Sequence, residues 1–159
     1  MKNVLAFNLK RNKLKLDLGL EVDMIEEEIQ EFYNAKNLAE QIDAMADVRY
    51  VYEGTQLKHS YNMQVMDEDI TKIVGQFHRL SVNIVSQELG DNSQYLDKIM
   101  NHAWDVVCEI NAEKGTAKDD NGKVTKHKSL RNATNEIREF LDAMTGVVVE
   151  ENDGEEGTH

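Results

Sequence analysis

Two groups of acidic residues stand close together in the first third of the sequence, where their spacing could support metal chemistry. Glu28 and Glu31 are three residues apart, and Asp43 and Asp47 are four residues apart further along the chain. On an α-helix these spacings place each pair on one face, where like charges repel by roughly a few tenths of a kcal/mol. A shared cation would remove that repulsion. Oxygen ligands of this kind suit Mg²⁺ or Mn²⁺ and, through the metal, the phosphates of a substrate.

Helices must position these carboxylates, because the apolar residues around them recur at three- and four-residue steps. This period predicts one helix from Leu20 onward, whose core face carries Ile25, Ile29 and Phe32. After a turn, the same period predicts a second helix over residues 38–57. The two helices are close enough in sequence to pair as a hairpin.

Helical geometry indicates which of these acidic residues share a face next to the apolar core. At 100° per residue, Glu28 and Glu31 lie about 60° apart, on a stripe that borders the apolar face. On the second helix, Asp43 and Asp47 lie within about 60° of Glu40. In an antiparallel hairpin the two acidic stripes would face each other at the edge of the core. A solvated acidic face is the alternative explanation, and the spacing alone leaves both open.

The rest of the chain carries further helical periods and two polar segments. Helices are expected over residues 67–85, 95–110 and 129–144, the last capped by Ser129. Residues 1–19 are basic and are expected to form a short helix and a connector. A second connector is expected at residues 59–62, and a lysine-rich loop at residues 114–128. Residues 150–159 are expected to form a disordered acidic tail. The sequence therefore predicts an all-α bundle of four or five helices, in a single domain over residues 1–149.

Composition limits the classes of partner and the compartment. The 159 residues carry a formal net charge of −12, which argues against sequence-independent binding to DNA or RNA. Apolar runs stay well below the 18 residues of a membrane span. Cys108 is the single cysteine, so no disulfide forms within the chain. We expect a soluble, cytoplasmic protein that binds neither a nucleic acid polymer nor a membrane.

These motifs resemble the MazG-like branch of the all-α NTP pyrophosphohydrolases, and most closely the phage-type members related to phosphoribosyl-ATP pyrophosphohydrolase. The resemblance rests on a Glu-Glu-x-x-Glu helix, an Asp-x-x-x-Asp helix that runs on into Tyr-Val and Gly-Thr, and two downstream motifs. In this sequence they are Glu27-Glu28-x-x-Glu31, Asp43 to Asp47 followed by Tyr50-Val51 and Gly54-Thr55, Asn111-x-x-Lys114, and Asp120-x-Gly122-Lys123 with Lys126.

The resemblance implies cleavage of a nucleoside triphosphate between its α and β phosphorus atoms, which gives a monophosphate and pyrophosphate. It implies that Mg²⁺, or Mn²⁺, polarises the phosphoryl oxygens and activates a water molecule. The resemblance implies that the metal ligands are Glu28, Glu31, Asp43 and Asp47. It implies that the catalytic residues are Glu27 and Glu28. The implied substrate-binding residues are Asn111, Lys114, Lys123 and Lys126.

Several alternatives stay open at this stage. Many members of the branch have a glutamate where this chain has Ala44, so Asp43 would have to take that role. The substrate could be dUTP or phosphoribosyl-ATP in a narrower enzyme. A non-catalytic helical module, whose acidic face binds a basic protein, is a further possibility. Related proteins are dimers or tetramers, so the resemblance implies a homodimer or homotetramer.

Overall fold

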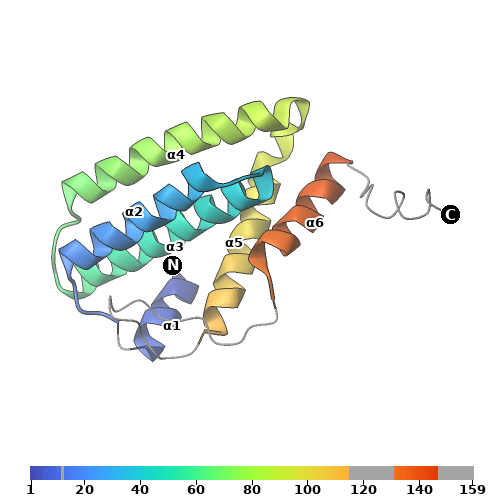
Figure 1. Ribbon diagram of the computed structural model, residues 1–159. Helices are drawn as coiled ribbons and strands as arrows, with labels where there is room; N and C mark the ends of the chain where they lie inside the picture. Colours follow the sequence, from blue (N-terminus) through green and yellow to red (C-terminus); the bar gives the residue numbers. More distant parts are fainter. Residues whose placement is uncertain (12, 115–130, 147–159) are drawn as a thin grey trace.

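The computed structural model describes residues 1–11, 13–114 and 131–146, and the regular elements in these ranges are all helical (Figure 1). The acidic residues lie on α2 (Leu18–Asn34) and α3 (Leu38–Tyr61), which form an antiparallel hairpin. Their sequence explains where both helices begin. The side chain of Asp17 accepts a hydrogen bond from Leu20 N at 3.2 Å, and that of Asn37 accepts one from Glu40 N at 2.9 Å, as N-cap residues do.

The other elements surround this hairpin. They are α1 (Lys2–Lys10), α4 (Glu68–Leu89), the short 3₁₀ helix η1 (Gly90–Tyr95), α5 (Leu96–Ala112) and α6 (Ala133–Thr145). Figure 1 shows α4 alongside the hairpin, with α5 and α6 paired across its far end. The short helix α1 packs against α3 and α5. Gly90, at φ +56°, ends α4 in a backbone conformation that favours glycine.

Helix α3 is the centre of the bundle, because it packs against α1, α2, α4, α5 and α6. Three consecutive residues of α3, Ala44, Met45 and Ala46, are all buried and together span about 200° of its circumference. A helix that is apolar over so wide an arc must be enclosed. On the outer side of the hairpin, Phe32 of α2 meets Phe77 of α4 edge to face, with ring centroids 5.3 Å apart.

The structure confirms the predicted all-α bundle. The four or five helices expected for the bundle correspond to α2–α6, and α1 is the short helix expected within residues 1–19. None of the described helices combines the length and the apolar composition that a membrane crossing requires. The predicted acidic tail at residues 150–159 and most of the lysine-rich loop lie outside the described residues.

Three predicted boundaries are wrong. The helix expected over residues 67–85 continues to Leu89. The connector expected at residues 59–62 is mostly helical, because α3 continues to Tyr61. Burial explains the extra turn: Lys58 and His59 are only 3% exposed, and His59 Nδ1 lies 2.8 Å from the carbonyl oxygen of Thr55. The last helix begins at Ala133 and not at Ser129, since the side chain of Asn132 accepts a hydrogen bond from Asn135 N at 3.0 Å and caps it.

Candidate active site

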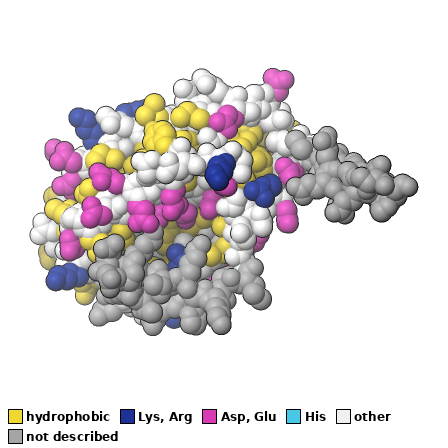
Figure 2. Space-filling view, in the orientation of Figure 1, with side chains coloured by type: hydrophobic (Ala, Val, Ile, Leu, Met, Phe, Trp, Pro, Cys, Tyr) yellow, Lys and Arg dark blue, Asp and Glu magenta, His cyan; other side chains and the backbone are white. Residues whose placement is uncertain are grey.

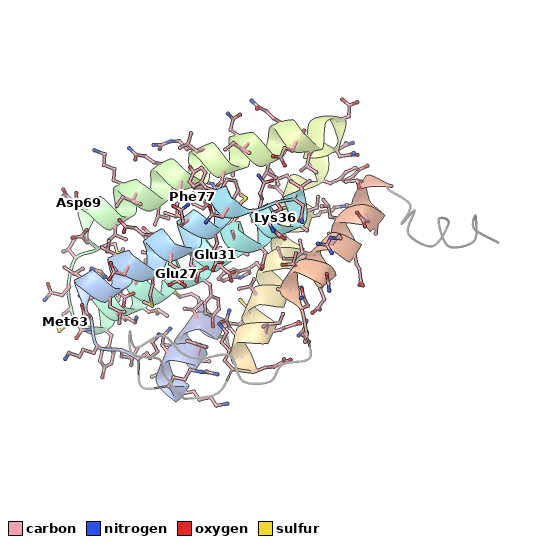
Figure 3. All side chains as sticks on the ribbon, in the orientation of Figure 1. Glu27, Glu31, Lys36, Met63, Asp69 and Phe77 are labelled. Carbon is pink, nitrogen blue, oxygen red and sulfur yellow. The ribbon has the colours of Figure 1, made fainter. Side chains whose placement is uncertain are left out.

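Three carboxylates from the two helices of the hairpin meet at the surface of the bundle. One oxygen each of Glu28, Glu31 and Asp47 lies within 4.8 Å of the other two. Glu28 is buried, Asp47 is partly buried and Glu31 is exposed. Figure 3 shows Glu27 and Glu31 on α2, and Figure 2 shows acidic side chains in a band across the middle of this face. The facing acidic stripes expected of a hairpin are therefore present, and three predicted metal ligands lie together.

Burial and mutual repulsion dominate the electrostatics of this cluster. Burial raises the pKa of the Asp47 carboxyl well above its usual range, and the charges of Asp43, Glu28 and Glu31 raise it further. The charge of Lys114 opposes this effect and lowers the pKa of Asp47. Hard carboxylate oxygens at such short separations are suitable ligands for Mg²⁺ or Mn²⁺, and a divalent cation would neutralise the repulsion. These three side chains therefore fit the implied metal.

The predicted fourth ligand, Asp43, lies beside the cluster and not within the group of three. Its Oδ2 atom accepts a hydrogen bond from Thr134 Oγ1 of α6 at 3.2 Å. Asp43 also lines a second hollow of about 300 Å³ with Glu31 and Glu40. Its charge still acts on Asp47, where it adds to the effect of burial in raising the pKa. Asp43 thus links the acidic cluster to α6.

Two other glutamates of the acidic segments, Glu27 and Glu40, are not part of the group of three carboxylates. Glu27, the predicted catalytic residue with the weakest helical position, is exposed on α2. Glu40, on the same face as Asp43, supports the start of α3, because its Oε2 atom accepts a hydrogen bond from Lys36 N at 2.7 Å. That bond explains the presence of Glu40 without a metal.

The structure brings two of the predicted substrate-binding residues to the acidic cluster. Asn111 and Lys114, from the end of α5, line one cavity together with Glu28 and Asp47. The Asn111 amide is held in place, since its Nδ2 atom donates to the carbonyl oxygen of Val107 at 2.9 Å. The other two predicted substrate-binding residues, Lys123 and Lys126, lie outside the described residues.

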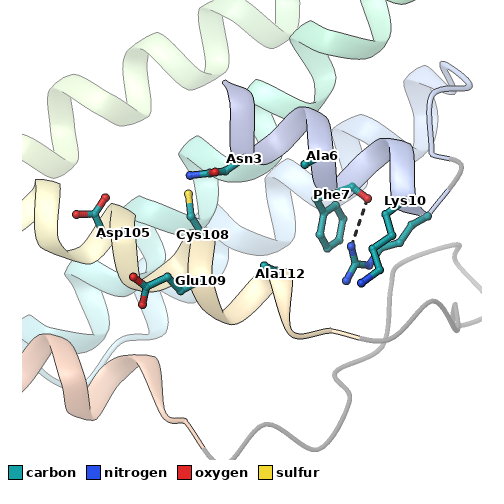
Figure 4. A pocket seen from close by; sticks show the side chains of 9 residues that line it. Asn3, Ala6, Phe7, Lys10, Asp105, Cys108, Glu109 and Ala112 are labelled. Atoms are coloured by element: carbon teal, nitrogen blue, oxygen red, sulfur yellow. Dashed lines mark hydrogen bonds between the residues drawn. The ribbon is translucent and has the colours of Figure 1, made fainter.

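Arg11 positions the end of α5, a role that the sequence did not suggest. Its side chain is 4% exposed and donates hydrogen bonds to the main-chain oxygens of Asn111, at 3.3 Å, and of Lys114. It also donates to the carbonyl oxygen of Phe7 at 3.3 Å and lies 4.1 Å from the centre of the Phe7 ring. Figure 4 shows how this part of α1 lies against α5, across a hollow of about 340 Å³ that Cys108 and Glu109 also line.

A buried ion pair lines the cavity that Glu28, Asp47 and Lys114 share, and the sequence did not predict it. Lys58 Nζ pairs with Glu21 Oε1, and Thr55 Oγ1 donates to Glu21 Oε2 at 2.8 Å. Glu21 is 1% exposed, so it belongs to the core despite its charge. The sequence could have indicated this position. Glu21 precedes Glu28 by seven residues, which places both on the same face of α2 to within about 20°.

The comparisons with known proteins support the reading of the hairpin. The family model of phosphoribosyl-ATP pyrophosphohydrolase matches residues 9–72, a range that includes all of α2 and α3 and therefore the three clustered carboxylates. No curated protein and no solved structure gives a significant match. Residues 9–72 of this chain therefore resemble the phosphoribosyl-ATP pyrophosphohydrolase family, which is consistent with an all-α NTP pyrophosphohydrolase of the MazG-like kind.

Proposed function

We propose that this protein is a Mg²⁺-dependent nucleotide pyrophosphohydrolase that converts a nucleoside triphosphate or deoxynucleoside triphosphate to its monophosphate and pyrophosphate. The observation that carries the proposal is the meeting of Glu28, Glu31 and Asp47 within 4.8 Å, beside a cavity that Lys114 also lines. Carboxylates next to a lysine suit a substrate that arrives as a metal–phosphate complex. The family match of the hairpin supports the same reaction class.

In this proposal Glu28, Glu31 and Asp47 hold the metal, and Asp43 is a further ligand or supports the site through its charge. When bound, Mg²⁺ would polarise the phosphoryl oxygens and lower the pKa of a water molecule. Mn²⁺ has the same preference for oxygen ligands and should substitute for it. Glu27 is exposed beside the site, where it could accept a proton from the attacking water; Glu28 is the alternative base.

Lys114 and Asn111 are proposed to contact the substrate. Lys114 lines the same cavity as Glu28 and Asp47, and its positive charge lowers the pKa of Asp47. Both observations support a role for Lys114 in binding the phosphates that approach the carboxylates. The proposal extends to Lys123 and Lys126 as additional phosphate-binding residues. It also keeps a cytoplasmic location, where nucleoside triphosphates and Mg²⁺ are available.

Metal binding tests the proposal without relying on turnover. We expect calorimetric titration with Mn²⁺ to show binding to the wild-type protein and at least tenfold weaker binding to Asp47→Asn and Glu31→Gln. Glu26→Gln is the matched control, because it removes one negative charge from an exposed position of α2 outside the cluster. Equal Mn²⁺ affinity in all four proteins would contradict the assignment of the metal site.

Turnover distinguishes the enzyme from its main alternative, a non-catalytic acidic module that binds a basic protein. The enzyme should release pyrophosphate from at least one nucleoside triphosphate, and EDTA or Asp47→Asn should abolish that release. A binding module should keep its partner in EDTA. Measuring pyrophosphate release from a set of nucleotides that includes dUTP and phosphoribosyl-ATP would also distinguish an enzyme of broad substrate range from one specific for dUTP or for phosphoribosyl-ATP.

We further propose that the protein is a homodimer or homotetramer. A largely apolar groove of about 560 Å³ lies between α3, α4 and α5, with Val48, Val74 and Met100 among its lining residues. Leu80 of α4 adds exposed apolar surface, at 53% exposure. Apolar surface of this kind is typical of faces that bind another subunit. Sedimentation equilibrium at micromolar concentration should give at least twice the monomer mass, and a monomer would contradict this assembly.

A further inference from the structure

A cavity lies on the inner side of the acidic cluster, between α1, α2, α3 and the end of α5. Glu28 and Asp47 contribute to its lining, and its volume is about 70 Å³. Phe7, Met24 and Tyr50 supply apolar walls. A chemical group attached to a phosphate that is held at the carboxylates would therefore extend into a space with both apolar walls and polar side chains, a combination that suits the nucleoside part of a nucleotide.

Two asparagine amides face this cavity, one from α1 and one from α5, and each is fixed to its own helix. Asn8 Nδ2 donates to the carbonyl oxygen of Val4 at 2.8 Å, and Asn111 Nδ2 donates to that of Val107 at 2.9 Å. The two residues are 4% and 7% exposed. Within the described ranges no group donates to either amide oxygen. Both oxygens are thus oriented in advance for an N–H donor on a ligand.

The inner end of the cavity is polar but carries no net charge. Glu21 and Lys58, 1% and 3% exposed, pair there, and Thr55 donates to Glu21. Because the charge of Lys58 is already balanced, a phosphate at this end would lose its hydration without gaining an uncompensated cation. A neutral base does not incur this penalty.

The size of the cavity favours one ring over two. A cavity that binds benzene in a protein core measures about 150 Å³, roughly twice the volume present here. A single ring could be accommodated by small shifts of Met24, whose unbranched side chain adapts readily. A fused purine ring would have to displace Phe7 and Tyr50, which pack edge to face in the core with centroids 5.6 Å apart.

We propose that this cavity is a base subsite that selects pyrimidine over purine nucleotides, and that Asn8 and Asn111 recognise the edge of the base. The proposal rests on the proposed function, because the metal–phosphate complex would place the nucleoside at the cavity. The imide N–H of uracil or thymine, or the amino group of cytosine, would donate to an asparagine oxygen. The preference differs from the purine substrate that gives the matching family its name.

Nucleoside binding tests the subsite without phosphate, metal or turnover. Uridine, cytidine, adenosine and guanosine are titrated into the full chain, and binding is followed by NMR through the side-chain amides of Asn8 and Asn111. We expect both pyrimidine nucleosides to shift these resonances and to bind at least fivefold more tightly than the purine nucleosides. Equal or tighter binding of adenosine or guanosine, or no binding of any nucleoside, would overturn the proposal.

Asn8→Ala removes one of the two recognition groups. It should weaken uridine binding about fivefold, the effect of one net hydrogen bond, and leave adenosine binding nearly unchanged. Asn3→Ala is the matched control on the same helix, since Asn3 lines the separate hollow between α1 and α5. Unchanged uridine affinity in Asn8→Ala would argue against the role of Asn8.

A second variant guards against a folding defect in Asn8→Ala. Gly54 lines the cavity, and an added Cβ would meet Asn8 Nδ2 at 3.6 Å and Val4 Cγ1 at 3.8 Å, both ordinary contact distances. Gly54→Ala should therefore fold and should weaken uridine binding by reducing the space. Unchanged binding would count against the cavity as the subsite.

The subsite and the proposed function can fail separately. If uridine binds as expected but no nucleoside triphosphate releases pyrophosphate, the proposed function is wrong and the base subsite stands. If purine triphosphates are hydrolysed as fast as pyrimidine triphosphates and adenosine binds as tightly as uridine, the function stands and the subsite is wrong.

Discussion

Arg11 donates a hydrogen bond from Nη2 to the main-chain oxygen of Asn111 at 3.3 Å, across a sequence separation of 100 residues. The same guanidinium donates to the carbonyl oxygen of Lys114, and burial lowers its pKa from the ordinary value. Carbonyls at the end of a helix attract a cation, because intrahelical partners are missing there. The N-terminal helix thereby determines where two proposed substrate-binding residues stand relative to the carboxylates.

Arg11→Met should weaken nucleotide binding more than it slows the chemical step. Without the guanidinium, the end of α5 loses its link to α1, whereas Glu28 and Asp47 keep their own positions on the hairpin. We expect KM to rise about tenfold, with kcat within about threefold and Mn²⁺ affinity unchanged, and stability to fall by about 2 kcal/mol. Lys10→Met, on the same helix and exposed, is the control. A parallel loss of Mn²⁺ affinity would show that Arg11 acts on the metal site as well.

Asp47→Asn should stabilise the metal-free protein at neutral pH. The raised pKa of Asp47 means that the folded protein binds this proton more tightly than the unfolded chain does. The metal-free wild type therefore loses stability as pH rises from the usual carboxyl pKa through the raised value. Urea unfolding in EDTA should show Asp47→Asn to be more stable by about 1 kcal/mol at pH 8, a gain typical of substitutions at a functional site.

The difference between Asp47→Asn and the wild type should disappear near pH 4, where the wild-type carboxyl is protonated, and should reverse in Mg²⁺, which stabilises only a protein that binds it. A less stable Asp47→Asn protein at pH 8 in EDTA would mean that the Asp47 carboxylate is better compensated than its neighbours indicate.

Lys58→Met should be among the most destabilising single changes in the hairpin. It would leave the carboxylate of Glu21, which is 1% exposed, buried without its cationic partner, at a cost of about 3–5 kcal/mol in the free energy of unfolding. The double variant Glu21→Gln with Lys58→Met should recover most of that loss, since neither charge remains. Denaturant unfolding of the two single variants and the double variant measures the coupling. Additive losses would argue that the pair is not coupled.

Arg131→Gln should have a much smaller effect, although Arg131 has more ionic contacts. Its guanidinium reaches Glu136 at 2.6 Å and Glu109 at 2.8 Å, but these carboxylates are 33% and 60% exposed, so water screens the attraction. We expect a loss below about 1 kcal/mol at pH 7. Arg131 lowers the pKa of Glu136, so this contribution should vanish as pH falls through that lowered pKa. An NMR titration of Glu136 should show its pKa rising in Arg131→Gln.

The hairpin and its acidic cluster were predictable because both depend on local periodicity. The steps from Glu28 to Glu31 and among the apolar residues of α2 fix which side chains share a face, and a short turn leaves an antiparallel partner as the simplest arrangement. Asp43 marks the limit of this reasoning. Its spacing to Asp47 is correct for a shared face, yet its carboxylate also accepts a hydrogen bond from Thr134, 91 residues away in the sequence, which periodicity could not reveal.

Long-range pairing explains what the sequence did not show. Glu21 and Lys58 lie 37 residues apart, and each alone is typical of a solvated helix surface. Only the packing of α2 on α3 buries both, and only then does their pairing become necessary. The start of α6 illustrates the same limit on a smaller scale: Ser129 and Asn132 are both good N-cap residues, and their order in the chain does not decide between them.

The central position of α3 has a consequence for how this protein can change over evolutionary time. Asp47 lies on a helix that packs against five others, so a substitution that moves α3 would disturb the whole bundle. Asn8 and Asn111 lie on α1 and α5, which pack against fewer neighbours. Descendants of this protein could therefore acquire new substrates through changes in α1 and α5, while the proposed metal site is inherited unchanged with α3.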